Sequence, residues 1–182
     1  GYALYPRLLS EKEPQDVDTS LRLVLMFTLP MTVGAIVLAE SYLTILNIAY
    51  SVATPVLILL AVDAMCLNLS SIFSTIVKGA ERFDAEAKIN YKNMVRSRLF
   101  LLLSLPFAQA AITLPSAYFI LNSMAGDAVN AATYIAAIAL LVDTGLMIVQ
   151  YTMAKRSLNF TISWIHLSRY AGSTILMALF LY

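Results

Sequence analysis

Five long apolar runs limit what this chain can fold into. They cover residues 21–46, 52–77, 99–121, 128–153 and about 160–182. A helix needs roughly 20 predominantly apolar residues to cross a bilayer, and each run has that length. The apolar residues are continuous rather than alternating, which is not typical of the strands of a membrane barrel. We therefore predict an all-α, polytopic transmembrane bundle with five full spans.

The whole chain, residues 1–182, is expected to be a single transmembrane domain that is truncated at both ends. It begins with Gly1 rather than Met and stops inside an apolar run. Residues 1–5 are typical of the end of an earlier helix, which Pro6 would stop. The composition agrees with this class, because 60% of the residues are hydrophobic and 13% are charged. In soluble domains about half of the residues are apolar and about a quarter are charged.

Several classes of function lack the residues they would need. The net charge is +1 and no basic run is interleaved with aromatic residues, so nucleic-acid binding is not indicated. One cysteine and one histidine cannot form a disulfide framework or a histidine-based metal site. The sequence has no phosphate-binding loop motif and no Ser–His–Asp arrangement. We predict no enzyme activity, no cofactor and no metal site within this chain.

The basic residues predict the orientation of the spans. Of the 12 Lys and Arg residues, all except Arg169 fall on alternate connections or at the span ends beside them. Lys and Arg are enriched on the cytoplasmic side of membrane proteins. We therefore place connections 6–20, 78–98 and 154–159 in the cytoplasm. The chain is predicted to be a multi-pass protein of the cell membrane.

Two carboxylates lie deep inside predicted spans, where an ionisable side chain is costly and usually faces the bundle interior. They are Asp63 of the second span and Asp143 of the fourth. At about 100° per residue, Ser70 and Ser74 fall within about 20° of Asp63 on a helix. Gln150 falls within about 40° of Asp143, on a face otherwise rich in alanine. Both faces are predicted to turn towards a cavity or a partner helix.

Two arginines complete the candidate pathway. Arg169 lies inside the fifth span, and Arg22 begins the first span, from which it can reach the cytoplasmic surface. The hypothesis of a substrate or ion pathway therefore uses Asp63, Asp143, Arg169, Ser70, Ser74, Gln150 and Arg22. The alternative is that Asp63 or Asp143 pairs with Arg169, or with a helix outside the chain, only to fix the packing.

Three prolines interrupt predicted spans. Pro30, Pro106 and Pro115 each remove a backbone donor and clash with the preceding turn, so each is expected to kink its helix. Kinks can serve as gating hinges, and these residues are our hinge candidates. Proline is also simply commoner in membrane helices than in soluble ones.

The first half of the chain resembles a known family. The segments that carry the resemblance are LYPRLLSE (residues 4–11), LPMTVGAIVLAESYLTIL (residues 29–46) and NIAYSVATPVLILLAVDAMCLNLSSIFSTIVKGAER (residues 47–82). They are similar to polysaccharide flippases of the multidrug/oligosaccharidyl-lipid/polysaccharide exporter superfamily. The resemblance covers about 80 residues, and the rest matches only in hydropathy and loop order.

The resemblance implies a transporter of 12 or 14 helices in two lobes, of which this chain is part of the second. The remaining helices of that transporter would be its partners, together with membrane lipid and the cargo. The lobes would rock about a central cavity and move a polyprenyl-(pyro)phosphate-linked oligosaccharide by alternating access.

Two other functions stay open. The first is an H⁺- or Na⁺-coupled multidrug antiporter of the same superfamily, in which Asp63 and Asp143 would bind the ion. The second is a non-transporting membrane scaffold, or a piece of an integral membrane enzyme whose active residues lie elsewhere.

Overall fold

A computed structural model describes residues 14–81, 98–124, 126–157 and 164–181. All of its regular elements in these ranges are helices, as predicted. They are α2 (Pro14–Val37), α3 (Ala39–Leu46), the 3-10 helix η1 (Ile48–Ala53), α4 (Thr54–Glu81), α6 (Arg98–Ser123), α7 (Ala128–Ser157) and α8 (Trp164–Leu181).

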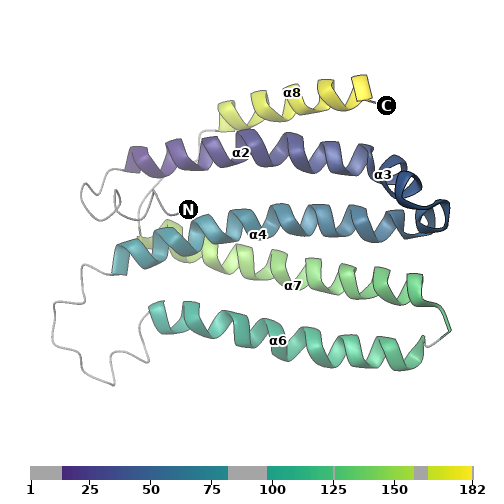
Figure 1. Ribbon diagram of the computed structural model, residues 1–182. Helices are drawn as coiled ribbons and strands as arrows, with labels where there is room; N and C mark the ends of the chain where they lie inside the picture. The colour runs from purple at the N-terminus through teal and green to yellow at the C-terminus, as the bar shows by residue number, and fades with distance from the viewer. Residues whose placement is uncertain (1–13, 82–97, 125, 158–163, 182) are drawn as a thin grey trace.

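The five long helices lie side by side in the order α8, α2, α4, α7 and α6 (Figure 1). Consecutive long helices run in opposite directions, so Lys78, Lys155 and Arg156 lie at one end of the bundle, which we call the basic end. The junction of α3 with η1 and the C-terminal end of α6 lie at the opposite end. The connections therefore alternate between the two ends as the basic residues predict. That the basic end faces the cytoplasm stays a prediction.

Four of the predicted spans coincide with helices that are long and apolar enough to cross a membrane. Among the described residues these are Asp18–Val37, Ile48–Lys78, Phe100–Ser123 and Ala128–Arg156. The run predicted at 160–182 contains α8, which has 18 residues and is not one of these four. The expected end of an earlier helix at residues 1–5 lies outside the described residues.

The first span differs from the prediction at both of its ends. Helix α2 begins at Pro14, so residues 14–20 are helical rather than part of a connecting loop. Proline is well tolerated in a first turn, because its missing N–H has no partner there. Leu38, with φ −90° and ψ 2°, separates α2 from α3 within the run expected to be continuous. Two hydrogen bonds continue across the bend, from Leu38 N to Gly34 O (3.0 Å) and from Tyr42 N to Leu38 O (2.8 Å).

The helices continue through the three hinge candidates. Pro30 lies inside α2, and Pro106 and Pro115 lie inside α6. The interruption in the first span falls at Leu38 instead, where neither proline nor glycine marks it in the sequence. A hinge role for the three prolines stays a prediction.

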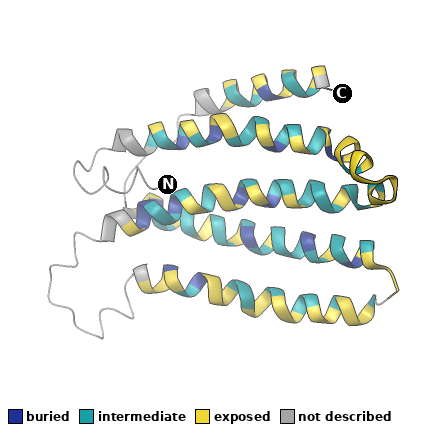
Figure 2. Cartoon of the chain, viewed as in Figure 1, coloured by how far each residue is buried: buried dark blue, intermediate teal, exposed yellow. Residues whose placement is uncertain are grey.

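A hydrophobic core joins four helices near the basic end. It consists of Leu21 and Leu25 from α2, Phe73, Ile76 and Val77 from α4, Leu102 from α6 and Ala154 from α7. The Phe73 ring meets the Tyr151 ring edge to face, with centroids 5.4 Å apart. Figure 2 shows that much of α3 and α6 is exposed, while α2, α4 and α7 carry buried residues where they face one another. The tightest packing therefore lies between the middle of the bundle and its basic end.

The core predicts where truncation destabilises the protein. Ile76 is fully buried, so Ile76→Ala is expected to lower the free energy of unfolding by about 2–5 kcal/mol, as truncated core side chains do. Ile112 of α6 is 53% exposed, and Ile112→Ala is the matched control with little expected effect. Thermal unfolding of the purified variants in detergent measures both. Equal losses of stability would contradict this position of the core.

Candidate polar cavity between α4, α6 and α7

The two deep carboxylates lie side by side. Asp63 of α4 is 8% exposed and Asp143 of α7 is 5% exposed. Their carboxyl groups interact with each other directly. The sequence left open whether each would pair with Arg169 or with another helix, and the structure brings them together at the contact of α4 with α7. A hydrogen bond between two carboxyl groups needs a proton on one of them, because an ionised carboxylate only accepts.

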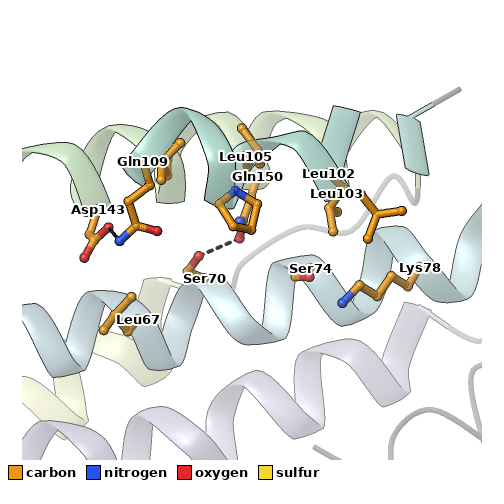
Figure 3. A pocket seen from close by; sticks show the side chains of 12 residues that line it. Leu67, Ser70, Ser74, Lys78, Leu102, Leu103, Leu105, Gln109, Asp143 and Gln150 are labelled. Carbon is orange, nitrogen blue, oxygen red and sulfur yellow. Dashed lines mark hydrogen bonds between the residues drawn. The ribbon is translucent and has the colours of Figure 1, made fainter. Parts of the chain in front are cut away.

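Gln109 of α6 joins this pair. Its Nε2 donates a hydrogen bond of 2.6 Å to Asp143 Oδ1. Figure 3 shows the Gln109 nitrogen turned towards Asp143 and the amide oxygen turned away. Sequence reasoning missed this residue. The signal was a lone glutamine in the apolar run LSLPFAQAAITLP, since polar side chains inside membrane helices usually face the protein.

A second polar contact joins α4 to α7 on the basic side of the carboxyl pair. Ser70 Oγ donates to Gln150 Oε1 at 2.6 Å. The two residues were expected on the faces of Asp63 and Asp143, and the structure places them opposite each other (Figure 3). The Asp63–Asp143 contact and the Ser70–Gln150 bond both lie between α4 and α7. Carboxyl, amide and hydroxyl groups therefore follow one another along this interface.

These groups line a cavity of about 160 Å³ between α4, α6 and α7. Its polar lining consists of Ser70, Ser74, Lys78, Gln109, Asp143 and Gln150. Leucines from all three helices and Pro106 supply the apolar walls. Figure 3 shows Ser74 and then Lys78 beyond Ser70, away from Asp143. The cavity thus runs from Asp143, the member of the carboxyl pair that lines it, towards the Lys78 ammonium group at the basic end.

The two candidate arginines lie outside this cavity. Arg22 forms an ion pair of 2.5 Å with Asp18, one turn before it on α2. Arg169 is exposed on α8, which packs against α2 rather than against α4, α6 or α7. Of the seven residues in the predicted pathway, the structure therefore groups Asp63, Asp143, Ser70, Ser74 and Gln150, and it leaves the two arginines apart.

One oxygen of the carboxyl pair lacks a hydrogen-bond partner among the described residues. This atom is Asp63 Oδ1, which is buried. On the next turn of α4, Cys66 Sγ lies 3.7 Å from Thr144 Oγ1. The Thr144 hydroxyl therefore already has a neighbour other than Asp63. A buried polar atom without a partner is costly, and in native proteins such atoms often mark a functional site or an unseen water or ion.

The chemistry of this arrangement is that of binding. Carboxyl, amide and hydroxyl groups can hold a proton or a cation, or hydrogen-bond the hydroxyls of a sugar. No group of three or more His, Cys, Asp and Glu side chains that could hold a metal occurs within the described ranges. Comparison with protein-family models, with curated proteins and with solved structures finds no match. The assignment of function therefore depends on the cavity itself and on the sequence resemblance.

The Ser70–Gln150 bond predicts a measurable coupling between α4 and α7. In a double-mutant cycle of Ser70→Ala and Gln150→Ala, we expect a coupling energy of about 0.6 kcal/mol and at most about 1.7 kcal/mol, the range of such bonds inside membrane proteins. Unfolding of the four proteins in detergent measures it. Strictly additive effects would show that the two side chains do not interact.

Proposed function

We propose that this chain is part of an exporter that moves a lipid-linked oligosaccharide across the membrane by alternating access. The observation that carries the proposal is the polar cavity within helices of membrane-spanning length, lined from Asp143 to Lys78. A charged and hydroxyl-rich headgroup cannot cross hydrocarbon unaided, so its carrier needs such a path. The resemblance of the first half of the chain to polysaccharide flippases supports the same cargo.

The cavity offers different chemistry at its two ends. The Lys78 ammonium group at the basic end can form charge-assisted hydrogen bonds to a phosphate or pyrophosphate. Deeper in the cavity, Gln109, Asp143 and Gln150 can donate to or accept from sugar hydroxyls. In this proposal the phosphate enters beside Lys78 and the sugars follow the polar line towards the carboxyl pair. The remaining helices of a 12- or 14-helix transporter would close the cavity, and no residue has a catalytic role.

Lys78 gives the proposal a direct test. In the whole transporter reconstituted into liposomes, Lys78→Ala is expected to slow the flipping of a polyprenyl-pyrophosphoryl oligosaccharide about tenfold, because it removes a charge-assisted bond to phosphate worth about 1.5 kcal/mol or more. Access of the headgroup to an external glycan-binding protein measures the rate.

Lys155→Ala is the matched control for this test. Lys155 is exposed in the last turn of α7, at the same end of the bundle but outside the cavity lining. Flipping by this variant should equal that of the wild type. Equal rates for Lys78→Ala and the wild type would overturn the assignment of Lys78 to the phosphate. Arg169→Ala, assayed in parallel, tests whether α8 also contributes to the pathway.

The carboxyl pair also favours a second candidate, an H⁺- or Na⁺-coupled multidrug antiporter. Asp63 and Asp143 are buried together, while both candidate arginines lie outside the cavity, so the deep end is acidic rather than cationic. Asp63→Asn is then expected to abolish efflux of a cationic dye driven by an ion gradient, with the dye's fluorescence as the measurement. Undiminished efflux by this variant, together with loss of oligosaccharide flipping in Lys78→Ala, would leave the flippase as the better account.

A further inference from the structure

Gln109 is the side chain through which α6 contacts the carboxyl pair. Its amide nitrogen, which carries two hydrogens, lies 2.6 Å from Asp143 Oδ1. The positive end of the amide dipole therefore faces the carboxyl group. The amide oxygen, the atom that could bind a cation, points the other way (Figure 3).

We propose that Gln109 makes the Asp63–Asp143 pair selective for a proton over Na⁺. The inference rests on the proposed transport function only for the purpose that the selectivity would serve. The selectivity itself is a property of the two carboxyl groups and Gln109. Hard metal cations are held by several oxygen ligands. A Na⁺ ion against Asp143 Oδ1 would meet the hydrogens of the Gln109 amide instead of an oxygen.

The neighbouring oxygens do not supply a replacement shell. The Ser70 hydroxyl and the Gln150 amide oxygen bind each other, and the Thr144 hydroxyl lies against Cys66. A proton needs no such shell, because one acceptor on the second carboxyl group is enough. The buried Asp63 Oδ1, which has no partner among the described residues, gives the pair an acceptor to which a proton can move.

Few charged groups on the surrounding helices can compete with the pair. On α4, Lys78 lies at the far end of the same cavity. Asp18 and Arg22 of α2 bind each other. Glu40 of α3 and Lys155 and Arg156 of α7 are exposed, and Gln109 is uncharged. A proton taken up from water in the cavity would therefore stay with Asp63 and Asp143, and it would leave to water when the cavity opens to the other side.

Infrared difference spectroscopy of the whole transporter tests the inference without any cargo. The C=O stretch of a protonated carboxylic acid should appear in the wild type and be lost in Asp63→Asn or Asp143→Asn. Replacing K⁺ by Na⁺ at constant ionic strength should leave the wild-type band unchanged. A wild type with no such band at any pH, or with a band that Na⁺ removes, would overturn the proposal, and neither measurement needs a variant to fold.

Gln109→Glu supplies the positive arm of the test. It replaces the N–H donors by a third carboxyl group that supplies oxygen ligands, so Na⁺ should now remove the protonated-acid band at concentrations that leave the wild-type band unchanged. Ser116→Ala on the same helix is the control, because its hydroxyl bonds only Ile112 O. A Na⁺ response identical in Gln109→Glu and Ser116→Ala would remove Gln109 from the selectivity.

This outcome is separable from the transport proposal. Loss of the infrared signal with normal oligosaccharide flipping would remove the proton site and keep the flippase. A protonated-acid band in a protein that does not flip the oligosaccharide would keep the proton site and remove the flippase.

Discussion

The contact between Asp63 and Asp143 is the interaction on which the arrangement of α4, α6 and α7 depends. A single carboxyl group in the middle of a span costs about 2.5–3.5 kcal/mol on insertion scales. The Gln109 amide reduces that cost for Asp143, and the two carboxyl groups reduce it for each other when a proton lies between them. Turning either helix by half a revolution would expose its carboxyl group to lipid. The rotation of α4 and α7 about their own axes is therefore set by one polar contact, with the Ser70–Gln150 bond two turns further along as a second register point.

Apolar packing plays a complementary part near the basic end. There Phe73, Ile76 and Val77 of α4 pack against α2, α6 and α7. Helix α7 contacts both α4 and α6 extensively, whereas α4 and α6 contact each other much less. The polar cavity lies in the space that results between α4 and α6. The same packing that closes the bundle on the side of α2 thus leaves a cavity along the polar faces of α4 and α7.

Helical periodicity predicted the parts of the site that lie on one helix. The alignment of Ser70 and Ser74 with Asp63, and of Gln150 with Asp143, follows from about 100° of rotation per residue. Periodicity carries no information about which faces meet, so the finding that Asp63 faces Asp143 rather than Arg169 or a helix outside the chain required the structure. Gln109 has no ionisable neighbour on its own face, only Thr113 and Ser116, and it becomes a site residue only when α6 packs against α7. The bend at Leu38 keeps its hydrogen bonds, and neither proline nor glycine stands at the bend, so no residue type predicted it.

The central claim is that the faces of α4, α6 and α7 that carry the polar residues enclose a water-accessible cavity rather than a lipid-filled groove. The most direct measurement is thiol labelling in the intact membrane, on a background in which the buried Cys66 is replaced by alanine. Ser74→Cys, in the cavity lining, should react readily with a water-soluble maleimide. Phe107→Cys, 76% exposed on α6, outside the cavity lining and predicted to face lipid, should not. Equal protection of both cysteines would contradict the account.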